Sequence, residues 1–85
     1  VITPNGDGLN DFFEIIGLYQ FESVELQVFD RFKNLIYQNS NYQNNWEVNS
    51  TVRDGTYFYI LKLNKIGERP IIRRGSLLIT REMLN

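Results

Sequence analysis

Oxygen-bearing side chains gather at the start of the chain, between Thr3 and Asp11. Asn and Asp alternate there with Gly, and an EF-hand-type calcium loop spaces its oxygen ligands in a similar way around a central Gly. In that register the ligands would be Asn5, Asp7, the Leu9 carbonyl, Asp11 and Glu14. Thr3 would then occupy the first position, where such loops usually have Asp, which weakens the match. The alternative is a pair of tight turns, Asn5-Gly6 and Asp7-Gly8, whose side chains bond their own backbone.

Catalytic chemistry has few candidates in this sequence. The chain contains no Cys and no His, which excludes disulfides, catalytic thiols, imidazole bases and the usual zinc ligands. An enzyme would have to use opposed carboxylates, or Ser or Thr with a base. No such residue stands in a recognisable catalytic motif. We therefore expect a binding domain and not an enzyme.

Charge is distributed unevenly along the chain. Residues 1–30 carry only acidic charges, and all nine Lys and Arg residues follow them. Arg69, Arg73 and Arg74 could build a basic face, although a sheet interleaves distant segments and these residues could equally be solvated positions on strands. The net charge of −1 and the lack of a helix-turn-helix pattern argue against nucleic-acid binding.

Strand signals recur along the chain with turn residues between them, and helical periodicity is weak. Val24, Leu26 and Val28 alternate with polar residues, as on a strand with one buried face. Gly75 lies inside a strand pattern and indicates a bulge or a close backbone approach. Five of the expected strands lie at residues 12–16, 24–29, 35–38, 56–63 and 71–80. The pattern predicts an all-β fold, an immunoglobulin-like antiparallel β-sandwich of six to seven strands.

The aromatic residues have two possible roles. Tyr57 follows the Asp54-Gly55 turn, where an immunoglobulin-like domain often places a tyrosine whose hydroxyl bonds a loop backbone. In that case Tyr57, Tyr59, Leu61 and Leu63 point inward. An exposed set could instead stack on sugar rings; the candidates are Tyr37, Tyr42, Trp46, Tyr57 and Tyr59. Core packing is favoured, because sheet cores use the same residues and the Asn-rich loop before Trp46 would deliver it to the core edge.

The length and the ends of the sequence suggest a part of a larger protein. At 85 residues the chain is one domain. No stretch is long enough to span a bilayer, and the first residues do not form a signal peptide. We expect residues 1–85 to be a single domain of a longer protein, with the targeting signal elsewhere.

Five segments occur in an order typical of one domain family. They are Thr3 to Phe13, Phe29 to Tyr37, Tyr42 to Trp46, Gly55 to Tyr59 and Gly75 to Arg81. Together they resemble the gliding-motility-associated C-terminal domain, the type B sorting domain of the Bacteroidetes type IX secretion system. In two places the chain departs from the family pattern: Phe32-Lys33 replaces the usual Trp-Gly, and Val48 replaces the usual Gly.

The resemblance implies that residues 1–85 form a single C-terminal sorting domain of a larger secreted protein. Outer-membrane components of the translocon, often a protein of the PorP/SprF kind, would recognise this domain. The cargo would lie upstream in the same chain and would reach the cell surface or the medium after passing the periplasm and the outer membrane. A partner strand could add to an exposed sheet edge. The candidate partner contacts are Arg69, Arg73, Arg74, Leu77, Ile79 and Arg81. The competing hypothesis is an immunoglobulin-like adhesive or carbohydrate-binding module.

Overall fold

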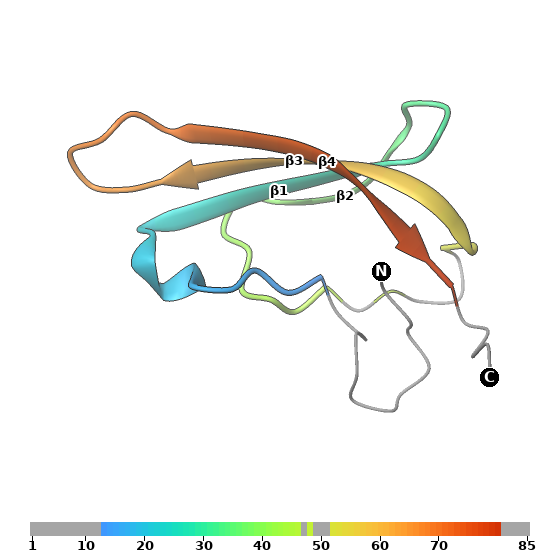
Figure 1. Ribbon diagram of the computed structural model, residues 1–85, viewed down its shortest axis with the longest axis horizontal. Helices are drawn as coiled ribbons and strands as arrows, with labels where there is room; N and C mark the ends of the chain where they lie inside the picture. The colour runs from blue at the N-terminus through green and yellow to red at the C-terminus, as the bar shows by residue number, and fades with distance from the viewer. Residues whose placement is uncertain (1–12, 47, 49–51, 81–85) are drawn as a thin grey trace.

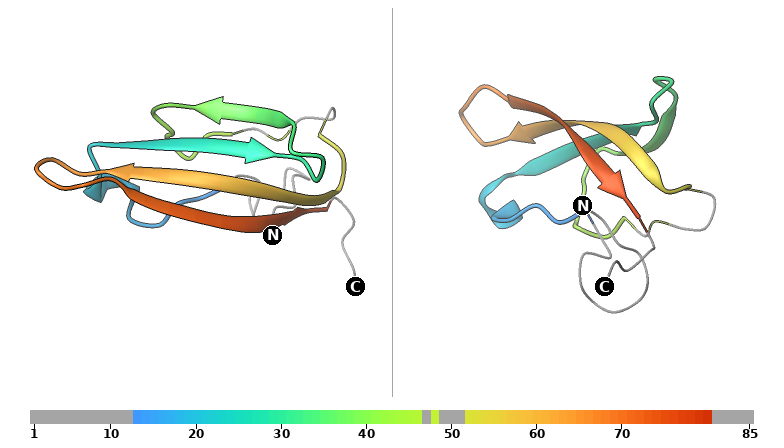
Figure 2. Two further views of the ribbon diagram at one scale, coloured as in Figure 1. Left: turned by 90° about the horizontal axis from the view of Figure 1, so that it is seen from above. Right: turned by 45° about the vertical axis from the view of Figure 1, so that its right-hand side comes forward.

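A four-stranded antiparallel sheet dominates the part of the chain that the structure describes (Figure 1). The computed structural model describes residues 13–46, 48 and 52–80. The strands are β1 (Ser23–Phe29), β2 (Leu35–Asn39), β3 (Gly55–Asn64) and β4 (Ile71–Ile79), and η1 (Leu18–Gln20) is a short 3-10 helix. Within these residues the strand order is β2-β1-β3-β4, so β2 and β4 are the edges (Figure 2). The predicted all-β antiparallel architecture is confirmed.

Among the described residues, the second layer consists of segments without strand structure. Residues 13–21 and the segment after β2 lie on the same side of the sheet (Figure 1). The strand predicted at residues 12–16 does not appear among residues 13–16. The described part of the chain therefore contains four strands, and neither the six to seven strands nor the β-sandwich is confirmed.

The core lies between the sheet and this second layer. Val24, Leu26 and Val28 of β1 are at most 1% exposed, as their alternation with polar residues predicts. Their partners across the β1–β3 ladder are Leu63, Leu61 and Tyr59. Tyr57, Leu61 and Leu63 are buried, and Tyr59 is half-buried against the same core. We call this the inner face of the sheet and the opposite side the outer face.

The turn between β1 and β2 is organised by one carboxylate. Asp30 accepts hydrogen bonds from the backbone N–H groups of Phe32 and Asn34, both at 2.9 Å, and from Asn34 Nδ2 at 3.1 Å. These bonds, the backbone N–H of Asn34 first, hold the pKa of Asp30 below its ordinary value. Lys33 lies inside the turn with φ of 68°, a left-handed conformation that favours glycine. Lys33 therefore carries backbone strain, at a position where the domain family that the chain resembles usually has Gly.

The β3–β4 hairpin joins the two strands that were expected at residues 56–63 and 71–80. Gly67 lies in its turn, and the Glu68 N–H donates to the Lys65 carbonyl at 3.1 Å. The ladder runs without a register shift and pairs Tyr59 with Gly75. A Cβ on Gly75 would lie less than 3 Å from the Tyr59 ring. Of the two explanations for Gly75, the close approach is the one observed.

Candidate functional site

The segment after β2 attaches the second layer to the sheet. Tyr42 is fully buried, and its N–H donates to the Val24 carbonyl of β1 at 2.8 Å. Its hydroxyl donates to the Phe13 carbonyl at 2.5 Å and accepts from the Trp46 N–H at 3.3 Å. Burial raises the pKa of Tyr42 to about 12, because the phenolate would lose its hydration. Tyr42 thus joins β1, the second layer and its own loop.

Asn44 also attaches the second layer, because its side-chain amide forms the two backbone hydrogen bonds that a neighbouring strand would form. The Ile15 N–H donates to Asn44 Oδ1 at 2.8 Å, and Asn44 Nδ2 donates to the Ile15 carbonyl at 3.2 Å. One side-chain amide thus satisfies both backbone groups of Ile15. Asn44 does so from a left-handed conformation, with φ of 57°, which Asn tolerates better than most residues. This explains why the segment around Ile15 needs no ladder partner.

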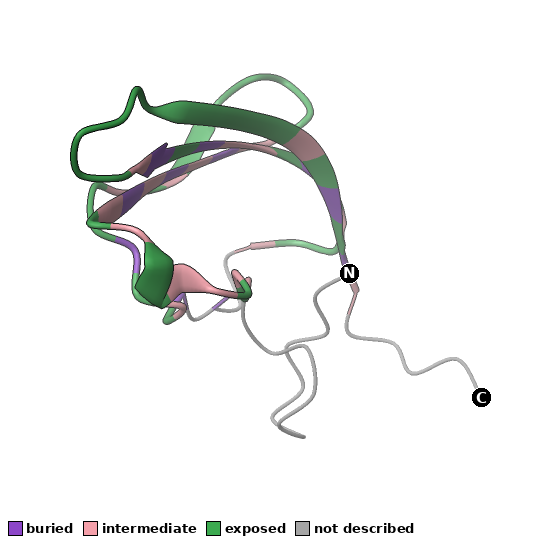
Figure 3. Cartoon of the chain, turned by 60° about the vertical axis from the view of Figure 1, so that its left-hand side comes forward, coloured by how far each residue is buried: buried purple, intermediate pink, exposed green. Residues whose placement is uncertain are grey.

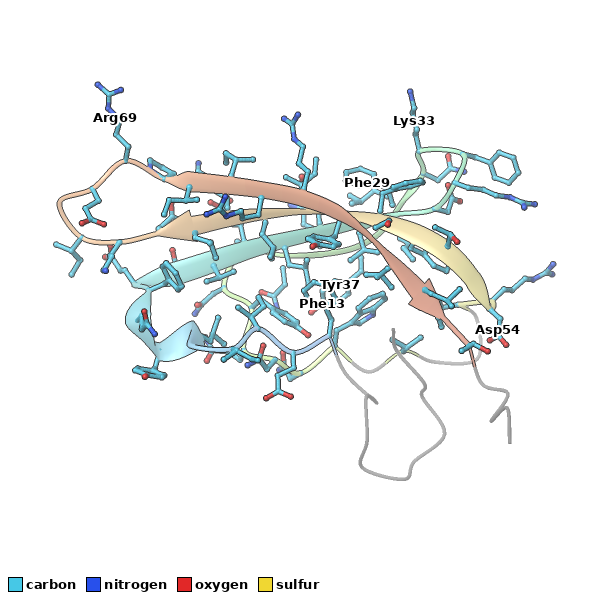
Figure 4. All side chains as sticks on the ribbon, in the orientation of Figure 1. Phe13, Phe29, Lys33, Tyr37, Asp54 and Arg69 are labelled. Atoms are coloured by element: carbon cyan, nitrogen blue, oxygen red, sulfur yellow. The ribbon has the colours of Figure 1, made fainter. Side chains whose placement is uncertain are left out.

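Trp46 is the third residue of the same motif and lies in the core. It is 5% exposed and stacks on Tyr37 with ring centroids 4.9 Å apart. Phe13 makes an edge contact with Tyr59 at 5.0 Å. Figure 4 shows Phe13 and Tyr37 beneath the sheet, on its inner side. We call Tyr42, Asn44 and Trp46 the clip, because together they hold the two layers.

The aromatic set predicted from the sequence is used for packing. Tyr42, Trp46 and Tyr57 are buried, and Tyr37 and Tyr59 are half-buried. The Tyr57 hydroxyl donates to the Arg53 carbonyl at 2.6 Å, which confirms the predicted bond to a loop backbone. These rings therefore form no flat exposed platform for a sugar.

The candidate partner contacts fall into three groups. Arg69 lies in the β3–β4 hairpin, Arg73 and Arg74 lie in β4, and all three are exposed. Leu77 and Ile79 are 7% and 0% exposed, so their side chains belong to the core. Arg81 lies outside the described residues. A partner that approaches β4 would meet its backbone edge and its outward side chains, and not Leu77 or Ile79.

Sequence reasoning missed the apolar character of the outer face. Phe58, Ile72 and Leu78 are each about half exposed there, and Figure 3 shows the exposed stretch along β4 and its hairpin. The sequence of β3 contained evidence of this apolar face, because apolar residues occupy the positions that point to both sides of the sheet. A central strand explains that pattern, and β3 is central among the described strands. Its outer side is nevertheless not buried.

The loop predicted to bind calcium lies largely outside the described residues. Asn5, Asp7, Leu9 and Asp11 fall in that part, and Glu14 is exposed. The described residues contain no group of three or more acidic side chains that could hold a metal ion. The calcium site therefore stays a prediction. Among the same residues, no helix has the length and apolarity needed to cross a membrane.

Comparison with known families identifies the domain. The family model of the CHU_C type IX secretion signal domain matches residues 1–79. Neither the comparison with curated proteins nor that with solved structures gives a match. The matched range includes the clip, the Asp30 turn and all four strands. The chain therefore belongs to the CHU_C type IX secretion signal domain family, and its function is that of a sorting signal for type IX secretion.

Proposed function

We propose that this domain directs its cargo to the cell surface or medium by presenting a folded surface to outer-membrane components of the type IX translocon. A protein of the PorP/SprF kind is the partner we favour. The cargo would lie upstream in the same chain and would cross the periplasm and then the outer membrane. The observation that carries this proposal is the long edge strand β4 with its exposed arginines.

The two edges of the described sheet differ in what they offer a partner. β2 has five residues, and its pairing with β1 contains a register shift. β4 has nine residues in regular register with β3. A long regular edge presents unpaired N–H and C=O groups to which another strand can add. We therefore place strand addition at β4.

Charge would select which strand adds there. Arg73 and Arg74 lie near the middle of β4 and are exposed. Two β4 edges pairing with each other would bring these cations together, and like charges on neighbouring strands are destabilising. An acidic strand would instead be attracted. The same residues thus favour a foreign partner over self-association.

Three further features belong to this proposal. The domain would act by binding and not by catalysis, because the full sequence lacks Cys and His and none of its acidic, Ser or Thr residues stands in a recognisable catalytic motif. We also propose that the domain is an immunoglobulin-like antiparallel β-sandwich of six to seven strands. The loop from Asn5 to Asp11 would be either a calcium site or a rigid turn. The adhesive or sugar-binding alternative gains no support from the family match or from the packed aromatic rings.

A reporter fusion tests the sorting role. Residues 1–85 are fused to the C-terminus of a fluorescent protein directed to the periplasm of a type IX-competent bacterium and of its secretion-deficient mutant. We expect surface or medium signal only in the competent strain. Signal in both strains would contradict type IX sorting, and so would retention in both when the matched outer-membrane partner is co-expressed.

The same assay tests the β4 edge. Arg73→Glu should reduce export, because it repels an acidic strand. Lys65→Glu makes the same change of charge in the hairpin turn, at an exposed position outside β4, and should export normally. Equal export of the two variants would show that the β4 edge is not the place where the partner strand adds.

A further inference from the structure

The outer face of the sheet contains a shallow apolar hollow between the β1–β2 turn and β4. Its floor is formed by Phe29, Phe58 and Ile60. Phe29 and Phe58 are directly paired across the β1–β3 ladder, and Phe58 is 47% exposed. Figure 4 shows Phe29 and Lys33 on the same side of the sheet, opposite Phe13 and Tyr37. Exposed aromatic side chains at the centre of a sheet are typical of interaction sites.

Positive charge surrounds this floor. Arg31, Lys33 and Arg74 line the hollow and are exposed. The carboxylate among the lining residues, Asp30, already accepts three hydrogen bonds within its own turn. The Arg31 guanidinium lies 4.9 Å from the Phe32 ring centroid, a contact that limits its movement. The hollow therefore joins an apolar centre to an electropositive rim.

The conformation of Lys33 adds a second observation. Its φ of 68° costs a side chain with a Cβ roughly 1–2 kcal/mol. Strain of this kind is concentrated at functional positions in proteins. Here the strained residue supplies one of the rim cations. The turn thus carries a charge beside the hollow where a glycine would be more stable.

We propose that this hollow docks an acidic segment of the outer-membrane partner, which inserts an aromatic or aliphatic side chain against Phe58 while its carboxylates pair with the rim cations. This inference rests on the proposed sorting role. A second copy of the chain fits the hollow poorly, because a symmetric contact would place two positive rims against each other. A polyanion without apolar groups would leave the phenylalanine floor uncovered. An acidic peptide with apolar side chains satisfies both features.

A titration tests the hollow directly. The 15N-labelled chain is mixed with a short synthetic peptide that alternates glutamate with phenylalanine or leucine. Matched peptides carry lysine in place of glutamate, or serine in place of the apolar residues. We expect amide shifts around Phe29 to Lys33 and Phe58 to Ile60, and binding about tenfold weaker for each matched peptide. Equal binding of all three peptides, or shifts confined to other regions, would overturn the proposal.

Variants of the chain separate the hollow from the rest of the outer face. Phe58→Thr and Arg74→Glu should each weaken binding of the acidic peptide about tenfold. Leu78→Thr and Lys65→Glu make the same kinds of change at exposed positions outside the hollow and should bind as the wild type does. If the control variants lose as much affinity, the hollow is not the docking site. Concentration-dependent sedimentation that Phe58→Thr abolishes would identify a second copy as the occupant and would also overturn the proposal.

The export assay then distinguishes this proposal from the sorting role. Export of the wild type together with failure of folded Phe58→Thr and Arg74→Glu supports docking at the hollow. Wild-type export with unchanged export of both variants contradicts the hollow and leaves the sorting role intact. If the wild type itself is not exported, the proposed function fails, and the peptide titration still decides whether the hollow binds.

Discussion

The two faces of the sheet use their side chains for different purposes. On the inner face, the clip bonds the second layer, and no buried side-chain N or O atom in the described part of the chain lacks a hydrogen-bond partner. On the outer face, Phe58, Ile72 and Leu78 are about half exposed, with arginine and lysine side chains beside them. The outer face has little role in burial, and its residues are therefore free to serve recognition.

This difference leads to a general expectation. Substitutions on the inner face should lower the free energy of unfolding and should affect export only through folding. Substitutions of the residues that line the hollow on the outer face should change stability by no more than about 1 kcal/mol and should affect binding directly. Variants of Tyr42, Gly75 and Asn44 on the inner face, and of Lys33 beside the hollow, test whether stability and binding are separated in this way.

Removal of the Tyr42 side chain should have the largest effect. Tyr42→Ala leaves a cavity at a fully buried position and should destabilise the domain by about 3–5 kcal/mol, the range measured for large aromatic deletions. That is a large fraction of the stability of a domain of this size. Urea unfolding followed by tryptophan fluorescence measures the change. Tyr42→Phe keeps the packing and should lose only about 1–2 kcal/mol; equal losses would show that the hydroxyl bonds dominate.

Alkaline pH should destabilise the inner face through the same residue. The pKa of Tyr42 is raised to about 12 from 10.0, so the unfolded chain releases this proton at lower pH than the folded one. The stabilisation is therefore fully present below pH 10 and is lost as the pH rises through about 12, an effect of roughly 2–3 kcal/mol. Unfolding free energies measured across this range should fall more steeply for the wild type than for Tyr42→Phe. Parallel curves would contradict the assignment.

Gly75→Ala should destabilise the inner side of β4. The new Cβ would lie less than 3 Å from the Tyr59 ring, and the resulting rearrangement should cost about 1–3 kcal/mol. Tyr59→Ala removes the obstacle, so the double variant should show strong non-additivity in a thermodynamic cycle. Additive losses would indicate that Gly75 is needed for its backbone and not for the space it leaves.

Asn44→Gly should loosen the second layer by a smaller amount. Glycine keeps the left-handed backbone but removes both hydrogen bonds to Ile15, and we expect a loss of about 1–2 kcal/mol. Hydrogen exchange at the Ile15 amide should accelerate more than exchange at β1. Asn44→Asp keeps the acceptor and loses the donor, so its loss should be intermediate. An unchanged exchange rate at the Ile15 amide would show that the Asn44 side chain does not protect it by hydrogen bonding.

Much of this inner face could be predicted from local patterns. The alternation of Val24, Leu26 and Val28 identified a buried face, and the position of Tyr57 predicted its bond to a loop. Residues 12–16 also read as a strand, yet Ile15 bonds a side chain 29 residues away in the sequence. A long-range partner of that kind leaves no periodic signal. Local pattern therefore identified the buried strands but not how the second layer is attached.

The outer face was harder to predict because it depends on register. Phe29 and Phe58 become neighbours only through the β1–β3 pairing, which the sequence of either strand does not specify alone. Leu77 and Ile79 were chosen for their place in the last strand, and their alternation with exposed neighbours puts them in the core. The face of a strand, and not its position in the chain, decides which side chains a partner can reach.

Lys33→Gly gives the smallest expected effect on stability and the sharpest contrast between the faces. Glycine relieves the left-handed strain and should raise the free energy of unfolding by about 1 kcal/mol. The same change removes a rim cation, so affinity for the acidic peptide should fall. Lys33→Asn relieves part of the backbone strain and also removes the charge. Lys33→Arg keeps both the strain and the positive charge. A gain in stability with a loss of binding would show that this turn is shaped for recognition at the expense of folding; unchanged binding would exclude Lys33 from the docking site.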